Sequence, residues 1–158
     1  MAAFGESNYN AALYRDARPT YDARIFDRID LFRGEAGAAS DLAVDIGSGT
    51  GQVANNLATR GFKKIIAIEP SAVMRANALQ HPNITYFDGN SNHLIAADGT
   101  ADLVVAAQAA HWFDMDKFLA EVKRVLKPSG VLAIIGYAQL EFPECPAATK
   151  LVWDLAES

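Results

Sequence analysis

The segment Val44-Asp-Ile-Gly-Ser-Gly-Thr-Gly51 constrains the fold of this chain more than any other stretch. A short apolar run, residues 42–46, leads into three alternating glycines, and apolar residues at helical spacing begin directly behind them at Val53. A strand that passes through a glycine turn into a helix is how α/β proteins build a nucleotide pocket. The glycines can adopt backbone conformations closed to other residues, and they let a ligand approach the main chain.

Apolar runs and helical patterns alternate along the rest of the chain. We expect strands at residues 42–46, 64–68, 84–87, 102–107 and 131–136. Helices are expected at residues 21–32, 51–60, 71–79, 115–126 and 147–156, with Ser71 as an N-cap and one helical turn near Leu94. Five apolar strands alternating with helices predict an α/β fold, a doubly wound parallel sheet with helices on both faces.

Composition narrows the classes of partner. The 158 residues include 14 Lys and Arg against 19 Asp and Glu, a net charge of −5, which argues against a polynucleotide partner. Cys145 is the only cysteine, so neither an internal disulfide nor a thiolate metal cluster can form, and no metal site is predicted. We see no secretory signal and no apolar run approaching the roughly 20 residues of a membrane span. A cytoplasmic protein without a membrane partner is therefore expected.

The spacing of the glycines discriminates between nucleotides. A dinucleotide-binding fingerprint places its third glycine where this chain has Gln52, since Gly51 comes one position early. This spacing disfavours NAD and FAD, and the absence of Gly-Lys-Ser or Gly-Lys-Thr after the turn excludes a Walker-type phosphate loop. What remains is a pocket for a ligand without a large phosphate load.

Three acidic residues follow or interrupt the first three strands. Asp45 lies inside the first strand, Glu69 ends the second, and Asp88 ends the third. Ligands bind at the carboxyl edge of such a sheet, where Glu69 is placed to accept hydrogen bonds from ribose hydroxyls. Carboxylates also suit a cationic ligand better than a phosphorylated one.

Five segments, in this order over residues 40–136, resemble the class I S-adenosylmethionine-dependent methyltransferases, in the group of methyltransferase type 11 and trans-aconitate methyltransferase-like enzymes. They are Val44-Asp-Ile-Gly-Ser-Gly-Thr-Gly51, Ile68-Glu-Pro-Ser71, Phe87-Asp-Gly89, Asp102-Leu-Val-Val105 with Gln108-Ala-Ala-His-Trp-Phe113, and Arg124-Val-Leu-Lys-Pro-Ser-Gly130. The resemblance implies a Rossmann-like sheet of strand order 3-2-1-4-5. It also implies one domain: an N-terminal cap segment and helix at 1–39, an S-adenosylmethionine-binding core at 40–137, and a loop with a short helix at 138–158.

The resemblance implies S-adenosyl-L-methionine as cofactor and assigns roles to residues. The implied cofactor-binding residues are Asp45, Gly47, Ser48, Gly49, Glu69, Asp88 and Gln108. Asp45 would place the ammonium group, Glu69 the ribose and Asp88 the adenine amino group. His111 is the implied catalytic residue, and Tyr14 and Arg18 are the implied substrate-binding residues.

Plainer roles stay open for most of these residues. The glycine run could be a tight turn without a ligand, Glu69 a solvated strand end, and Asp88 a turn former before Gly89. His111 could pack beside Trp112 and Phe113, which are most simply core or wall residues. Tyr14 and Arg18 could belong to a solvated loop, and Cys145 is expected to be an inert thiol.

The expected reaction is methyl transfer to a small molecule by in-line displacement, with O-methylation of a carboxylic acid as one form of it. A carboxylate acceptor needs no base, whereas a hydroxyl would need one, and His111 is then the first candidate. The alternatives are a truncated cofactor-binding module without turnover and, from another enzyme class, an NAD-dependent oxidoreductase.

The resemblance also predicts a departure from the family. Class I sheets have seven strands, whereas this chain ends about twenty residues after the fifth, so we expect a C-terminally short, truncated member. The fifth strand would then lie at an edge while carrying the apolar run Val131 to Ile135. An uncovered apolar edge favours pairing with another chain, so self-association through this strand is expected.

Overall fold

A computed structural model describes residues 21–136 of the chain. Its elements are α2 (Ala23–Glu35), β1 (Leu42–Ile46), α3 (Gln52–Thr59), β2 (Lys64–Ile68), α4 (Ala72–Ala76), β3 (Ile84–Phe87), β4 (Ala101–Ala107), the 3-10 helix η2 (Ala110–Trp112), α5 (Met115–Val125) and β5 (Leu126–Ile135). The strands form one parallel sheet of order β3-β2-β1-β4-β5. This confirms the predicted fold class and strand order. Several features singled out in the sequence lie outside the described residues: the predicted helix at 147–156, Cys145, Tyr14 and Arg18.

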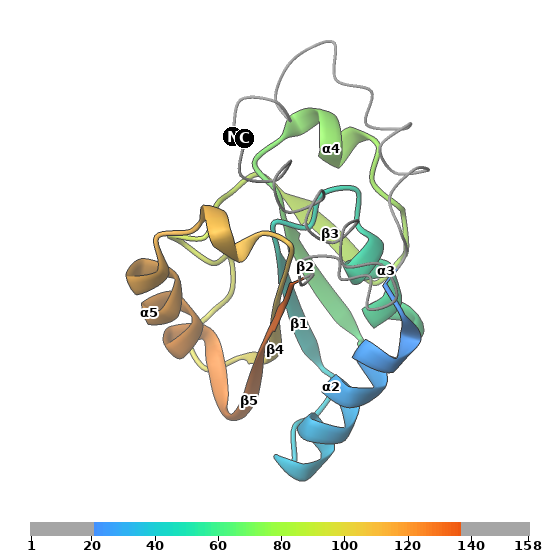
Figure 1. Cartoon of the computed structure of the whole chain (residues 1–158), viewed down its shortest axis with the longest axis vertical. Coiled ribbons are helices and arrows are strands. Elements are labelled where there is room, and N and C mark those ends of the chain that lie inside the picture. Colours follow the sequence, from blue (N-terminus) through green and yellow to red (C-terminus); the bar gives the residue numbers. More distant parts are fainter. Residues whose placement is uncertain (1–20, 137–158) are drawn as a thin grey trace, which may run out of the picture.

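Helices cover the two faces of the sheet separately, with α2 and α3 on one side and α5 on the other (Figure 1). Phe26 of α2 and Leu57 of α3 pack with the strand residues Ala43, Ile65 and Leu103. On the opposite face, a second cluster joins α5 to the alternate strand residues, among them Val44, Ile66, Val104, Phe118 and Val122. Both faces of β1 and β4 are therefore buried, which explains why these strands are apolar without alternation.

Three helices, α2, α4 and α5, begin directly after a residue whose side chain caps the helix. Asp22, Ser71 and Asp114 each accept a hydrogen bond from a backbone N–H of the helix that follows. The N-cap predicted at Ser71 is thus confirmed, but α4 ends at Ala76, earlier than expected. The reason is tertiary: the Leu79 N–H donates to the carbonyl of Thr50 (3.0 Å), and the Leu79 carbonyl accepts the Tyr86 hydroxyl (2.6 Å).

The junction between α5 and β5 differs from the prediction. We expected a break at Pro128 and Gly130 and a strand from Val131, but β5 begins at Leu126 and runs through both residues. Pro128 is tolerated because it lies in an irregularity of the β4–β5 ladder, between the pairs Ala101–Leu126 and Leu103–Val131, where no residue of β4 pairs with it. A side chain at Gly130 would come within 2.8 Å of the Ala101 carbonyl, which explains the glycine there.

Residues 90–100 form an irregular connection without a helix, so the helical turn expected near Leu94 was wrong. Arg124 of α5 donates to the carbonyls of Leu94 and Ala96 (both 2.9 Å), and Glu121 accepts the Leu94 N–H (2.8 Å). These bonds satisfy the backbone groups that a helical turn would have paired internally. The connection is therefore fastened to α5 instead.

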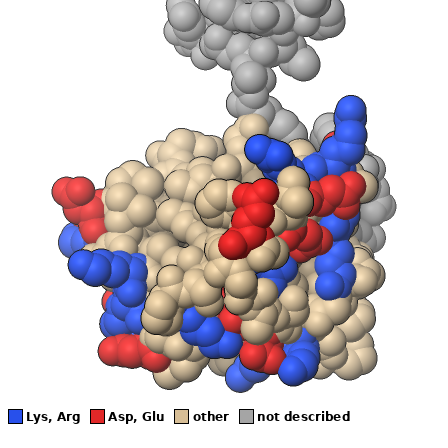
Figure 2. Space-filling model, turned by 90° about the horizontal axis from the view of Figure 1, so that it is seen from below, with Lys and Arg blue, Asp and Glu red and all other residues tan. Residues whose placement is uncertain are grey.

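Among the described residues, no helix has the length and apolar character needed to cross a membrane. Figure 2 shows acidic and basic side chains interspersed on the face seen from below. Ion pairs of the described surface include Arg60–Asp27 (2.8 Å) and Lys63–Asp41 (2.7 Å).

Candidate cofactor site

The glycine turn between β1 and α3 is held in left-handed backbone conformations. Gly47, Gly49 and Gly51 have φ angles of 69°, 55° and 81°. A Cβ at Gly47 would lie 2.5 Å from the Ala109 Cβ, and a Cβ at Gly51 would overlap the Tyr86 hydroxyl. Protein atoms therefore fill the side-chain space at two of the three glycines, whereas Gly49 has only ordinary contact with Met74.

Glu69 fastens this turn to the next element. Its carboxylate accepts the backbone N–H of Gly49 at one oxygen and that of Ser71 at the other, both at 2.9 Å. The side chain is buried, at 8% exposure, so the alternative of a solvated strand end does not describe it. An ionised carboxylate offers about four lone-pair sites, so two remain for a ligand.

Asp45 lies within β1 at 1% exposure. Its Oδ2 has no hydrogen-bond partner in the part of the chain that the structure describes. Burial, with a smaller contribution from the negative charge of Glu69, raises the pKa of Asp45 to about 7 against the opposing effect of a backbone hydrogen bond from Ala54. A buried carboxyl without a cationic partner is costly, and a cationic ligand would relieve that cost.

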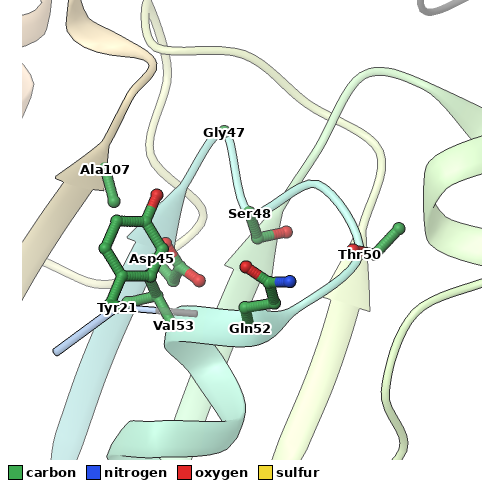
Figure 3. Close-up of a pocket in the computed structure, with 8 residues that line it drawn as sticks. All are labelled: Tyr21, Asp45, Gly47, Ser48, Thr50, Gln52, Val53 and Ala107. Carbon is green, nitrogen blue, oxygen red and sulfur yellow. The ribbon is translucent and has the colours of Figure 1, made fainter. Parts of the chain in front are cut away.

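A small hollow, partly open to solvent, lies beside this turn. Its lining consists of Tyr21, Asp45, Gly47, Ser48, Thr50, Gln52, Val53 and Ala107 (Figure 3). Asp45, Gly47 and Ser48 were predicted as site residues, and the Ser48 hydroxyl is buried without a partner among residues 21–136. Thr50 and Gln52 were missed although they lie in the glycine segment itself. Tyr21 was not singled out as a site residue; it directly precedes α2 and packs in the same core cluster as that helix.

Asp88 is linked to Glu69 by Arg75, a residue that the sequence analysis did not single out. Arg75 of α4 pairs with the Asp88 carboxylate at 3.2 Å and donates to the Glu69 carbonyl at 2.5 Å. The Asp88 side chain is 73% exposed, so it lies at the rim of the carboxyl edge. It does not line the hollow.

The two site residues predicted in the segment after β4 have different surroundings: one side chain ends in a buried atom and the other is exposed. Gln108 has a φ of 53°, and its Nε2 is buried without an acceptor in the described structure. His111 is exposed on η2, with its ring 4.9 Å from that of Trp112. Phe113 packs on Phe118 of the core at 4.9 Å between ring centroids, whereas Trp112 is 54% exposed and so is not a core residue.

Comparison with known proteins places this site in a family. A family model described as a methyltransferase domain matches residues 44–134. A Dictyostelium discoideum protein named as a methyltransferase is 38% identical over 128 residues, which cover 81% of this chain and 47% of the relative. A Saccharomyces cerevisiae protein named as an S-adenosylmethionine-dependent methyltransferase is 30% identical over 155 residues, 92% of this chain and 52% of the relative.

The fold agrees with these sequence matches. A solved type II methyltransferase from Anaeromyxobacter dehalogenans superposes with a TM-score of 0.68 at 31% identity, covering 89% of this chain and 58% of that one. The chain spans about half the length of the curated relatives it matches. It belongs to the class I S-adenosylmethionine-dependent methyltransferases, whose cofactor is S-adenosyl-L-methionine.

Proposed function

We propose that this chain takes part in methyl transfer from S-adenosyl-L-methionine to a small molecule, with O-methylation of a carboxylic acid as one form of the reaction. The observation that carries the proposal is the glycine turn, which Glu69 fastens beside the buried carboxyl of Asp45, whose Oδ2 has no partner among the described residues. Family membership supports the cofactor, and it goes against the alternative of an NAD-dependent oxidoreductase.

The residues present fit the cofactor. Asp45 Oδ2 and Ser48 Oγ are buried polar atoms that lack partners within residues 21–136, and both residues line the hollow. Asp45 would hold the ammonium group, Glu69 the ribose through its remaining lone pairs, and Asp88 the adenine amino group. Gly47 and Gly49 would let the methionine part lie against the backbone. When bound, the cofactor supplies a methyl group on a positively charged sulfonium.

The protein's contribution to the reaction would be alignment and exclusion of water, because in-line displacement at a sulfonium disperses charge. A carboxylate acceptor needs no proton transfer. For a hydroxyl acceptor, the exposed His111 on η2 is the proposed base. Tyr14 and Arg18, outside the described residues, stay predictions as substrate-binding residues. A cytoplasmic location likewise stays a prediction.

Two experiments test this function. Calorimetric titration with S-adenosylmethionine, S-adenosylhomocysteine and NADH should show binding of the first two and none of NADH. Incubation with methyl-labelled cofactor and a panel of small carboxylic acids should then show transfer of label. Binding without transfer would favour a cofactor-binding module without turnover, whereas binding of NADH alone would contradict the proposal.

Replacing Glu69 tests its place at the ribose. Glu69→Ala should weaken the affinity for S-adenosylhomocysteine by about 10- to 100-fold, because hydrogen bonds to a charged group are worth about 1.5–3 kcal/mol. Glu121→Ala is the matched control, since Glu121 also accepts a backbone N–H but lies on α5. This control should lose stability and keep its affinity. Unchanged affinity in Glu69→Ala would remove Glu69 from the site.

A further inference from the structure

The helix that follows the glycine turn begins without a side-chain cap. Gly51 is the N-cap residue of α3 and, as a glycine, has no side chain that could accept a hydrogen bond from the helix. The helices α2, α4 and α5, by contrast, each begin at a capping side chain. The turn at the start of α3 therefore depends on other elements to fix its position.

Tyr86 of β3 ends a chain of hydrogen bonds that begins in the turn. The Thr50 carbonyl accepts the Leu79 N–H at 3.0 Å, and the Leu79 carbonyl accepts the Tyr86 hydroxyl at 2.6 Å. Thr50 is one of the residues that line the hollow (Figure 3). The link thus connects a wall residue of the hollow to the strand at the far edge of the sheet.

The same hydroxyl also lies directly against the turn. A Cβ at Gly51 would come within 2.0 Å of the Tyr86 oxygen, so this oxygen occupies the space that a side chain at Gly51 would need. The Gly51 N–H donates to the Ser48 carbonyl at 2.9 Å, and Ser48 lines the hollow. Tyr86 therefore contacts the turn at Gly51 and is bonded to it, through Leu79, at Thr50.

The register of the sheet explains how a tyrosine on β3 reaches this turn. Asp45 of β1 pairs with Ala67 of β2, and Ala67 pairs with Tyr86 of β3, so the three residues lie in one row across the sheet. Ala67 is fully buried, and its small side chain leaves room between its two larger neighbours. Burial above all, together with the negative charge of Asp45, raises the pKa of Tyr86, so the hydroxyl keeps the proton that it donates to Leu79.

Tyr86 and Glu69 hold different parts of the glycine segment. Glu69 accepts the Gly49 N–H, whereas Tyr86 acts on Thr50 and Gly51. A segment rich in glycine loses much conformational freedom when it is ordered, so each added bond reduces the share of that cost left for a ligand. Tyr86 is not among the residues that line the hollow, so its effect on a ligand is exerted through the turn.

We propose that Tyr86 is a positioning residue of the cofactor site: its hydroxyl, bonded to the Leu79 carbonyl and packed against Gly51, holds the glycine turn in the conformation that receives the cofactor. This inference rests on the methyl-transfer function proposed above, which supplies the ligand. It gives Tyr86 an effect on cofactor affinity without a contact to the cofactor.

The test compares Tyr86→Phe with a variant at the other end of β3. Tyr86→Phe removes the hydroxyl but keeps the ring, which packs against the core. Its affinity for S-adenosylhomocysteine, measured by calorimetric titration, should fall by about 3- to 10-fold, because a neutral hydrogen bond is worth about that factor. Asn83→Ala is the matched control, since the Asn83 amide donates to the Phe62 carbonyl at 2.9 Å just before β3. It should lose stability and keep its affinity.

Amide hydrogen exchange in the free chain separates positioning of the turn from general stability. The N–H groups of Leu79 and Gly51 bond to the turn or within it. In Tyr86→Phe they should exchange about 3- to 10-fold faster relative to the amides of β4, because the local opening of the turn becomes more frequent. In Asn83→Ala this ratio should equal that of the wild type.

Three results would overturn the proposal. The first is unchanged affinity for S-adenosylhomocysteine in Tyr86→Phe, and the second is an equal loss of affinity in Asn83→Ala. The third is unchanged relative exchange of the Leu79 and Gly51 amides in free Tyr86→Phe. A wild-type chain that binds no S-adenosylhomocysteine would instead contradict the proposed function, and the exchange measurement, which needs no ligand, distinguishes the two failures.

Discussion

The three glycines of the β1–α3 turn are required for different physical reasons. Gly51 combines a left-handed backbone with direct approach of the Tyr86 hydroxyl, and Gly47 combines it with the approach of Ala109. Gly49 is constrained by its backbone alone, and its N–H donates to Glu69. At the residue scale, two of the three glycines in what looks like a ligand-binding motif thus serve protein packing. Gly51 makes room for β3, and Gly47 makes room for the segment after β4.

Alanine at Gly51 should therefore cost more than alanine at Gly49. We expect Gly49→Ala to lower the free energy of unfolding by about 1–2 kcal/mol through backbone strain. Gly51→Ala should lower it by about 3–5 kcal/mol, since overpacking adds to the strain. Urea denaturation measures both, and adding Tyr86→Phe should recover part of the Gly51→Ala loss. Equal losses in the two single variants would contradict this account.

The buried carboxyl of Asp45 predicts a pH-dependent stability. Its pKa of about 7 in the folded chain lies above the value of about 4 expected when unfolded, so the folded chain binds the extra proton between these values. The stabilisation is complete below about pH 4 and is lost as the pH rises through 7. Asp45→Asn cannot ionise, so it should be more stable than the wild type at pH 8, by on the order of 4 kcal/mol, and similar to it at pH 4.

Urea denaturation at both pH values measures this difference. Asp88→Asn is the control, because the Asp88 side chain is 73% exposed. Its effect on stability should be small at both pH values, because an exposed ion pair contributes little to folding. An Asp45→Asn effect of equal size at pH 4 and pH 8 would show that Asp45 is not buried with a raised pKa.

At the scale of elements, a buried carboxylate joins the amino ends of three strands. Asp102 of β4 is fully buried and accepts the backbone N–H groups of Asp41 and Leu42 (both 3.0 Å) at the start of β1. It also accepts Lys127 Nζ of β5 at 2.7 Å. Burial alone would raise the pKa of Asp102, but these hydrogen bonds, that of Lys127 above all, keep it below its usual value.

Removing the lysine should leave this carboxylate incompletely paired. We expect Lys127→Met to lower the free energy of unfolding by about 3 kcal/mol at neutral pH. Because the pKa of Asp102 is lowered in the folded chain, the stabilisation exists above its unfolded value and is lost as the pH falls through the folded one. The loss in Lys127→Met should therefore shrink in acid. Lys63→Met, which removes an exposed pair with Asp41, should cost under about 1 kcal/mol in the same urea titration.

At the scale of the whole molecule, β5 lies at an edge of the described sheet. It pairs with β4 on one side, and Ile134 is 50% exposed. The exposed apolar residues Met115 and Leu119 lie on α5, which packs on the same face as Leu132. An edge strand with exposed apolar residues can pair with another chain, so the self-association expected from the sequence is retained as a proposal.

Sedimentation velocity over a range of concentrations tests self-association. The wild-type chain should associate with increasing concentration, and Ile134→Lys should reduce association because a lysine at an edge opposes pairing. Leu31→Lys is the control, since Leu31 is exposed to a similar degree but lies on α2. A monomeric wild type, or an equal effect of the two variants, would show that the β5 edge is not the contact.

The amino-acid pattern by itself determined the sheet, because β1, β2 and β3 are short apolar runs bounded by turn residues, and their bounds match the prediction. It also determined the family, since the glycine turn and the acidic residues at strand ends are local signals. Only the tertiary structure decided the course of β5 through Pro128, because a strand tolerates proline only where no neighbour needs its donor. Packing likewise decided the raised pKa of Asp45 and the strained backbone of Gln108, since both depend on atoms distant in sequence.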